Sequence, residues 1–285
     1  MTTSLKSVFV TFYLVFLAAA TIVAIVQIGG PDFSLGWIGS ALTTAPFLIF
    51  LSWITITQRR ARTSARLPSI MAFATLGAAL AAWSWFIGFS GPAPALVALA
   101  GLGAFVAYVF WYSDLGPRRS VALTLGRALP DFDVKNEHGD AVASRSWRGQ
   151  PSVLIFYRGN WCPLCMAQIK ETAAHYREIE ARGARVALIS PQPPSHTRAL
   201  AKKHDVKFEY YVDDANCAAR VLGIDHPGGL PLGMQALGYA SDTVLPTVIV
   251  VDKEGIVRWV HETDNYRVRP EPQTFLEALS AVSAA

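Results

Sequence analysis

Two cysteines separated by two residues, Cys162 and Cys165, are the side chains of this 285-residue sequence whose chemistry is easiest to specify. Pro163 follows the first of them, and proline is favoured at the first position of a helix. A helix beginning here places the first thiol beside unpaired backbone N–H groups, which favour its thiolate and lower its pKa. The second thiol follows one turn later, within reach of a mixed disulfide on the first. We therefore expect Cys162 to attack and Cys165 to resolve.

The third cysteine, Cys217, leaves two interpretations open. It is either an apolar residue buried on a short helix or a second, distant resolving cysteine. A zinc site is not expected, because structural zinc takes four ligands and the sequence has no second C-x-x-C and no H-x-x-x-H. We expect no metal and no cofactor.

The residues around the cysteine pair predict a strand that leads into a helix. Residues 152–157 form a short continuous apolar run, typical of a strand buried on both faces. Residues 163–182 carry apolar side chains on one helical face and end at Gly183. Further segments predict a hairpin around 132–142, strands at 185–190, 208–212, 247–251 and 256–261, and helices near 195, at 215–222 and at the C-terminus. This alternation is typical of an α/β sandwich.

The sequence FYRGNWCPLC at 156–165, together with LPT at 245–247, resembles the thioredoxin superfamily. With LPDF at 129–132, it is most similar to peroxiredoxin-like members of the alkyl hydroperoxide reductase/thiol-specific antioxidant (AhpC/TSA, redoxin) family. The resemblance covers about residues 125–285 and implies a thioredoxin-like fold and an antioxidant or thiol–disulfide oxidoreductase activity. A C-x-x-C alone is a weak signal, but this one follows an apolar strand and a tryptophan and begins a helix.

The resemblance also implies roles for neighbouring residues. Pro246 is expected to be a cis-proline that faces the cysteine pair and presents backbone groups to an extended substrate. Arg158 has two interpretations, a positive charge beside the thiolate or a solvated loop residue. The residues expected to bind substrate are Arg158, Trp161, Pro163, Leu245, Pro246 and Thr247.

Two positions depart from the family patterns. Peroxiredoxins of this kind carry Thr or Ser three residues before the reactive cysteine to orient peroxide, whereas this sequence has Gly159. Thioredoxins carry a buried Asp six residues before the first cysteine as a proton acceptor, whereas this sequence has Phe156. Disulfide exchange is therefore expected to exceed peroxide turnover, and its proton route is left open.

The first 113 residues predict a membrane region. The whole sequence is 52% hydrophobic and 16% charged, which is more apolar than is typical of a soluble protein. Four runs without a charge, at 8–28, 35–56, 69–89 and 93–112, each approach or exceed the roughly 20 residues that span a bilayer as a helix. The first run is too long for a signal peptide. A linker at 114–127 then leads to a redox domain at 128–285.

Basic residues set the expected orientation. Arg59, Arg60, Arg62 and Arg66 lie between the second and third runs, and Lys6, Arg118 and Arg119 flank the bundle on the same side. Loops rich in Lys and Arg stay in the cytoplasm. We expect a multi-pass protein of the inner (cell) membrane, with both termini and the redox domain cytoplasmic. The net charge of +4 thus reflects topology and not a nucleic-acid surface.

The sequence as a whole predicts a membrane-anchored thiol–disulfide oxidoreductase. Its expected partners are a protein or small-molecule disulfide, or a peroxide, as substrate, a thiol as electron donor, and the lipid bilayer. The alternatives are a membrane-tethered redox sensor or adaptor without turnover, and a peroxiredoxin with a distant resolving cysteine. Catalytic turnover distinguishes the enzyme from the sensor, because a sensor reacts once and stops.

The orientation can be tested with reporter fusions placed after Tyr112. Because the four-arginine loop and Arg118 lie on one side of the bundle, a fused fluorescent protein should fold in the cytoplasm and fluoresce. A fused alkaline phosphatase should be inactive. Active phosphatase would instead place the redox domain in the periplasm.

Overall fold

Two compact units make up the chain, and each is described by itself. The computed structural model describes residues 2–31 and 33–283, so Asp32 and both chain ends lie outside the described residues. One unit contains 5–57 and 63–114 and consists of helices. The other consists mainly of residues 115 onward and contains the sheets.

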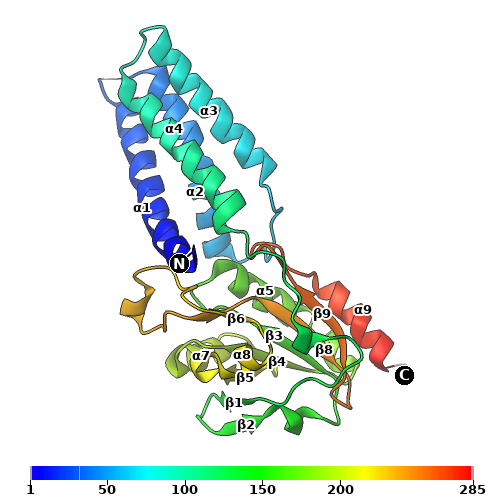
Figure 1. Ribbon diagram of the computed structural model, residues 1–285. Helices are drawn as coiled ribbons and strands as arrows, with labels where there is room; N and C mark the ends of the chain where they lie inside the picture. The colour runs from blue at the N-terminus through cyan, green and yellow to red at the C-terminus, as the bar shows by residue number, and fades with distance from the viewer. Residues whose placement is uncertain (1, 32, 284–285) are drawn as a thin grey trace. The chain divides into compact units, whose positions relative to one another are not determined.

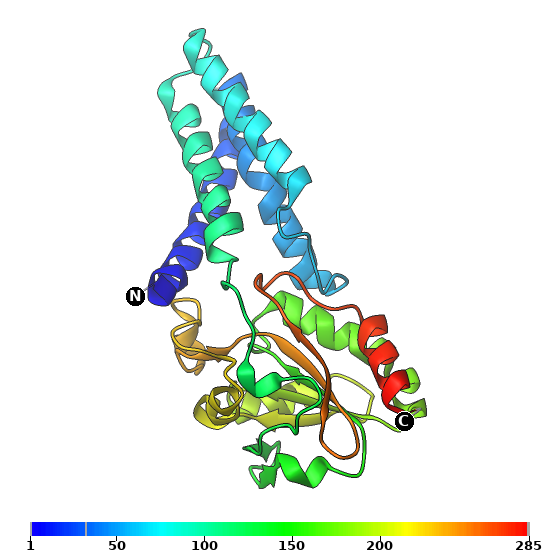
Figure 2. The same ribbon diagram turned by 45° about the vertical axis from the view of Figure 1, so that its right-hand side comes forward.

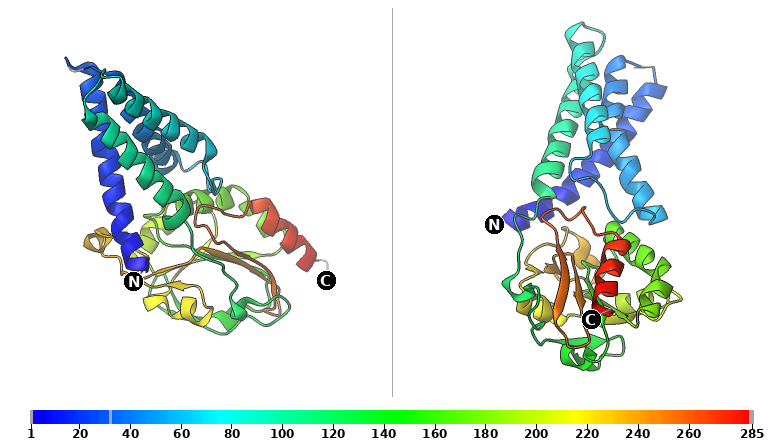
Figure 3. Two further views of the ribbon diagram at one scale, coloured as in Figure 1. Left: turned by 45° about the horizontal axis from the view of Figure 1, so that its top comes forward. Right: turned by 90° about the vertical axis from the view of Figure 1, so that its right-hand side faces the viewer.

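The helical unit contains four long apolar helices that run side by side as a bundle (Figure 3). All four are long and apolar enough to cross a membrane. The third ends at Phe86, earlier than the predicted residue 89, where Gly88 adopts a left-handed φ of 76°. The helices are α1 (Thr2–Gly29), α2 (Leu35–Thr57), α3 (Pro68–Phe86) and α4 (Pro92–Ala107), which continues into a π-helical turn, η1 (Tyr108–Tyr112).

Small residues let α2 and α3 approach closely. A Cβ added at Gly39 would lie 2.6 Å from the backbone of α3, and one added at Gly77 would lie 2.5 Å from the backbone of α2. Hydroxyl groups also connect the helices, since Ser40 donates to the carbonyl of Pro94 at 2.6 Å and Thr21 to Thr44 at 3.0 Å. This is the close packing by which apolar helices associate in lipid.

The C-terminal unit is built on a seven-stranded sheet with the order β2-β1-β5-β4-β3-β8-β9 (Figure 1). The three middle strands β3, β4 and β5 are parallel, and the strands on either side of them are antiparallel to their neighbours. A pair of short strands, β6 (Asp225–His226) and β7 (Thr243–Val244), forms a separate ribbon. The main strands are β1 (Asp133–Asn136), β2 (Ala141–Ala143), β3 (Ser152–Phe156), β4 (Arg185–Ser190), β5 (Glu209–Val212), β8 (Thr247–Val251) and β9 (Val257–Glu262).

Helices cover both faces of this sheet. Leu154 and Phe156 of β3 point into a core shared with α8 (Cys217–Val221), so by alternation Val153 and Ile155 face the other side. That other face carries α5 (Pro163–Ala174) and α9 (Pro272–Ser283), which Figure 2 shows together. The remaining helices are α6 (Tyr176–Ala181) and α7 (Pro194–Ala201), with short 3-10 turns η2 (Val121–Leu123), η3 (Ser144–Trp147), η4 (Asp214–Asn216) and η5 (Met234–Leu237).

The predicted fold class, four apolar helices followed by an α/β thioredoxin-like domain, is confirmed. Two details differ from the prediction. The helix expected over 163–182 divides at His175, whose φ of −99° and ψ of 9° are not helical. The ribbon of β6 and β7 was not predicted, because two-residue strands in a glycine-rich segment leave no periodic pattern.

Residues that were expected to form a linker pack on the sheet. Leu123 is buried in the main core, and the backbone N–H of Gly126 donates to the carbonyl of Val257 at 2.8 Å. The hydroxyl of Ser120 donates to the carbonyl of Leu222. These contacts precede residue 128, so the redox unit includes part of the segment before it.

These contacts predict that the C-terminal unit folds by itself and that Leu123 stabilises it. A fragment of residues 115–285 should fold, and Leu123→Ala in it should lower the free energy of unfolding by about 2–5 kcal/mol, because it leaves a cavity in the core. Val121→Ala on the same turn is the control. That side chain is 91% exposed, so its loss should change stability by less than about 0.5 kcal/mol. Urea unfolding measures both, and equal effects would contradict the assignment.

Candidate active site

The cysteine pair lies at the junction of β3 and α5. Residues 157–161 leave the end of β3, and α5 begins at Pro163 with Cys162 as its N-cap residue in an extended conformation. The carbonyl of Cys162 accepts from the backbone N–H of Met166 at 3.1 Å, which starts the helical hydrogen-bond ladder. The helix start that the sequence predicted is therefore present at the predicted residue.

Both thiols of the pair are buried, and no disulfide bond joins them. Cys162 is 2% exposed and Cys165 is 0% exposed. The interaction between the two thiols raises the pKa of Cys162 and lowers the pKa of Cys165. The guanidinium Nη2 of Arg269 donates to the sulfur of Cys165 at 3.6 Å.

The surroundings of the two sulfurs shift their pKa values in opposite directions. Burial by itself raises the pKa of Cys165, but the hydrogen bond from Cys162 and the charges and donors of Arg269 and Arg158 lower it to about 6. The hydrogen bond to Cys165, followed by burial, raises the pKa of Cys162. The predicted order, with the lower pKa on Cys162, is therefore wrong in this structure. The groups that lower the pKa of Cys165 are Cys162, Arg269 and Arg158, and Arg269 is remote from the helix start in the sequence.

Arg158 lies inside the protein, which excludes the solvated-loop interpretation. Its side chain is buried, and its Nη2 donates to the carbonyl of Gly229 at 2.6 Å. The guanidinium lies over the rings of Trp161, at 4.7 Å, and Tyr266, at 5.4 Å. Such stacking holds a guanidinium in place while its charge acts on the nearby sulfurs.

Gly159 has a backbone conformation that excludes larger residues. Its φ is 144°, which L side chains rarely adopt, and a Cβ there would lie 2.6 Å from Nε1 of Trp161. A threonine at this position would therefore strain the backbone and displace the tryptophan. The hydroxyl that orients peroxide in the resembling family has no room here.

A hydrogen-bond network holds the loop that precedes Cys162. The buried side chain of Gln192 accepts from the backbone N–H of Asn160 at 2.8 Å and donates to the hydroxyl of Tyr157 at 2.9 Å. The Tyr239 hydroxyl donates to the amide oxygen of Asn160, and the Tyr239 ring stacks on His196 at 4.7 Å. The glycine-rich segment between β6 and β7 thus contributes to the walls of the site.

The Leu245-Pro246-Thr247 segment lies at the same end of the sheet as the cysteine loop. Thr247 pairs with Phe156, the last residue of β3. The Leu245–Pro246 peptide bond is trans, so the expected cis-proline is wrong. An X-Pro bond favours trans by about 0.5–1 kcal/mol, and the backbone N–H of Leu245 is held by the carbonyl of Ile224 at 2.8 Å. Arg118 approaches the Pro246 carbonyl at 3.5 Å.

Cys217 is exposed at the start of α8, which excludes the buried-residue interpretation. Its sulfur accepts a hydrogen bond from Arg220 at 3.5 Å. Lys135 of β1 also interacts electrostatically with Cys217. These neighbours belong to other elements than α5, and the structure does not bring Cys217 into the network around the cysteine pair.

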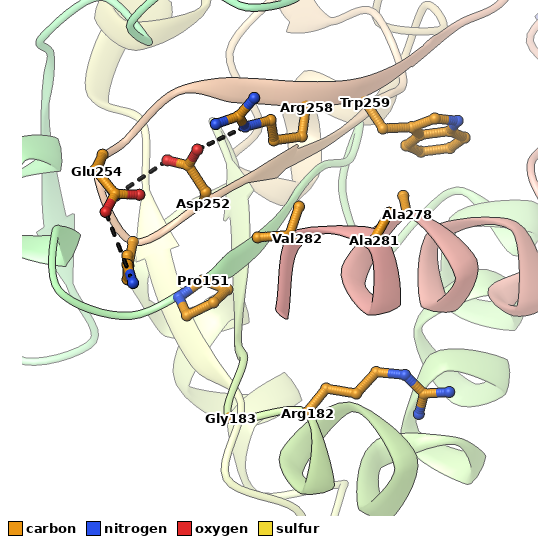
Figure 4. Close-up of a pocket in the computed structure, with 11 residues that line it drawn as sticks. Pro151, Arg182, Gly183, Asp252, Glu254, Arg258, Trp259, Ala278, Ala281 and Val282 are labelled. Carbon is orange, nitrogen blue, oxygen red and sulfur yellow. Dashed lines mark hydrogen bonds and ion pairs between the residues drawn. The ribbon is translucent and has the colours of Figure 1, made fainter. Parts of the chain in front are cut away.

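One cavity of the C-terminal unit lies away from the cysteines. It has a volume of about 720 Å³ and lies between the turn after β8 and the end of α9 (Figure 4). Pro151 lines it, just before the start of β3, whereas the cysteines follow the end of that strand. Its charged groups already have partners, as Arg258 and Asp252 form an ion pair at 2.6 Å. We assign no chemistry to this cavity.

The fold and the site define a thioredoxin-like domain with a vicinal dithiol at the start of a helix. Residues 125–260 match the model of the AhpC/TSA family. The chain is 30% identical over 148 residues to "Peroxiredoxin Q, chloroplastic" of Populus jackii, a match over 51% of this chain and 62% of that protein. This match therefore spans less than two thirds of the relative's length.

A bacterial relative is matched over almost its whole length. "Peroxiredoxin Bcp" of Bacillus subtilis (strain 168) is 23% identical over 163 residues, which are 57% of this chain and 99% of the relative. Among solved structures, Enterococcus faecalis AhpC aligns with a TM-score of 0.45 and 17% identity, over 55% of this chain and 90% of that one.

Sequence reasoning missed several residues around the site. Arg269 contacts a cysteine 104 residues earlier in the sequence, and nothing in the local pattern around 269 indicates this contact. Gln192, His196 and Tyr239 come from loops and helix starts whose polar residues look like ordinary surface positions. The sequence before Leu245 is rich in glycine, which indicates a loop but does not single out Tyr239.

The network predicts that Gln192 stabilises the loop before Cys162. Gln192→Leu should lower the free energy of unfolding by about 1–3 kcal/mol, because it leaves the N–H of Asn160 and the hydroxyl of Tyr157 without this partner. Gln235→Leu, at an exposed position, is the matched control. Thermal unfolding of both proteins measures the difference. A control as destabilised as Gln192→Leu would refute this role.

Proposed function

We propose that this chain is a membrane-anchored thiol–disulfide oxidoreductase in which Cys162 attacks the substrate and Cys165 resolves the intermediate. The observation that carries the proposal is the buried cysteine pair at a helix start, with Arg269 3.6 Å from the sulfur of Cys165 and Arg158 beside the pair. Cys162 is the N-cap residue and Cys165 lies further into α5 and is fully buried, so Cys162 is the sulfur at the start of the helix.

The reaction transfers two electrons from the thiol pair to the substrate. The sulfur of Cys162 attacks a disulfide, its S–S bond breaks, and one thiol leaves as a mixed disulfide forms. The sulfur of Cys165 then attacks Cys162 and releases the second thiol, leaving a Cys162–Cys165 disulfide. An external thiol donor reduces this disulfide and completes the cycle. Arg158 and Trp161 form the buried wall beside the pair.

Peroxide is a slower substrate in this proposal. Attack of Cys162 on a peroxide breaks the O–O bond and leaves a sulfenic acid, from which Cys165 displaces water. Peroxiredoxin relatives support this antioxidant reaction for the family domain. The conformation of Gly159 leaves no place for a peroxide-orienting hydroxyl, which favours disulfides.

The helical unit serves as the membrane anchor in this proposal. Many of its large apolar side chains point outward, with Phe12, Ile49 and Phe86 between 63% and 88% exposed. An apolar surface of this extent is stable in lipid and is a liability in water. With the arginine-rich loop in the cytoplasm, both termini and the redox domain also lie on the cytoplasmic side of the inner membrane.

Cysteine substitutions test the proposed roles by insulin reduction and by peroxide consumption with a thiol donor. Cys162→Ser should abolish both, because it removes the attacking sulfur. Cys165→Ser should trap a mixed disulfide or a sulfenic acid on Cys162 that mass spectrometry detects. Repeated turnover by the wild type excludes a one-time sensor.

Cys217→Ser is the matched control for these substitutions. Because Cys217 is exposed and contacts Arg220 instead of the pair, its replacement should leave turnover nearly intact. If Cys217→Ser traps the intermediate while Cys165→Ser turns over normally, the distant cysteine is the resolving one and the proposed assignment is wrong.

A further inference from the structure

Arg118 is buried at the end of the sheet from which the cysteine loop leaves. Its side chain is 6% exposed. Its Nη1 donates to the carbonyl of Thr263 at 3.3 Å and to the carbonyl of Pro246 at 3.5 Å. Its Nη2 donates to the hydroxyl of Thr247 at 3.3 Å and lies 3.7 Å from the carboxylate of Glu262. One guanidinium thus bridges the start of β8 and the end of β9.

The guanidinium acts on each residue of the segment 245–247. Proline has no backbone N–H, so the carbonyl of Pro246 is its only backbone hydrogen-bonding group, and Arg118 supplies a donor to it. The hydroxyl of Thr247 accepts from Arg118 and gives its own proton to the carbonyl of Leu245, at 3.0 Å. Through these contacts one side chain fixes hydrogen-bonding groups of all three residues.

Arg118 belongs to a part of the chain outside the family match. That match begins at residue 125. The carboxylate of Glu262 accepts from the backbone N–H of Ser120 at 3.1 Å, which holds the chain around Arg118 against β9. Burial lowers the pKa of Arg118 to about 10, and the charge of Glu262 opposes this shift, so the guanidinium is a cation at neutral pH. A charged fork with several acceptors suits the bridging of two strands.

We propose that Arg118 is a positioning residue that orders the segment 245–247 before a polypeptide disulfide binds to it. The inference rests on the proposed disulfide exchange and on the substrate-binding role expected for this segment, and it adds the residue that prepares the segment. Arg118 acts through Pro246 and Thr247. A segment that is already ordered loses less conformational entropy when substrate binds, so Arg118 strengthens substrate binding.

The expected effect depends on the size of the substrate. A polypeptide disulfide has residues on both sides of its cystine that can lie along the segment, whereas a small disulfide has none. Loss of Arg118 should therefore weaken the binding of polypeptide disulfides and leave the reaction with small ones nearly unchanged. The proposal gives Arg118 no part in bond making at Cys162, so the rate at saturating substrate should also be retained.

Single-turnover kinetics of the pre-reduced full chain in detergent test this role, with Cys217→Ser as background. Formation of the Cys162–Cys165 disulfide is followed by acid quenching, alkylation and mass spectrometry, with insulin as the polypeptide disulfide and hydroxyethyl disulfide as the small one. Arg118→Met should raise the half-saturating insulin concentration about tenfold, the effect of losing hydrogen bonds from a charged donor. The limiting rate with insulin and the rate with hydroxyethyl disulfide should change less than about twofold.

Arg119→Met is the matched control, because it removes the same charge at the next residue, which is exposed. It should leave all three values unchanged. An unchanged insulin value in Arg118→Met, or an equal loss with both substrates, would overturn the proposal.

Two further substitutions keep the test decisive if Arg118→Met does not fold. Arg118→Lys retains the charge beside Glu262 but lacks the planar fork, so it should restore only part of the insulin binding. Full restoration would show that the charge pair suffices and would refute the bridging role. Thr247→Val leaves Arg118 in place and should also raise the half-saturating insulin concentration. In that background Arg118→Met should have a smaller effect than alone, because the two side chains share a contact. Fully independent effects would contradict the proposal.

Amide hydrogen exchange separates this inference from the proposed function. In Arg118→Met, residues 243–249 should exchange faster than in the wild type while residues of α5 keep their rates. If exchange follows this expectation but the wild type reduces no disulfide, the proposed function fails and the positioning role stands. If the wild type reduces insulin and neither the exchange nor the half-saturating concentration changes, the positioning role is wrong and the proposed function stands.

Discussion

The pairing of β3 with both of its neighbours is the constraint on which the site depends. β3 lies parallel to β4 and antiparallel to β8, and all five of its residues are buried. A strand fixed on both sides cannot slip by one residue without moving its apolar side chains to the wrong faces. The pairing of Phe156 with Thr247 therefore fixes where the loop after Phe156 and the start of α5 begin.

The same register explains how distant segments reach one site. The ends of β3 and β4 lie at one edge, so Gln192, just after β4, meets the loop before Cys162. The ribbon of β6 and β7 brings the segment between them to Arg158 and Asn160. Each contact comes from a connection and not from a regular element, which is usual where a rigid sheet positions loops.

The difference between regular elements and connections also explains which features the sequence predicted. The buried strand at 152–157 and the helix start at Pro163 were predictable because each has a local cause, a continuous apolar run and a residue suited to the first turn. The order of the two cysteine pKa values was not predictable, because Arg269 acts on Cys165 from 104 residues away in the sequence. The trans bond before Pro246 differed because the cis form was inferred from resemblance, whereas local hydrogen bonds hold the segment in its extended path. The break at His175, whose backbone is not helical, was not predicted from the sequence.

The burial of both sulfurs one helical turn apart has a consequence for oxidative damage. A sulfenic acid becomes irreversibly inactive when a second oxidant molecule converts it to sulfinic acid before a thiol captures it. In the proposed reaction the capturing sulfur lies one helical turn from the one that is oxidised, so the helix need not unwind for the two to meet. We therefore expect capture within the pair to precede an encounter with a second oxidant molecule, and the domain to keep its cysteine at high oxidant concentrations.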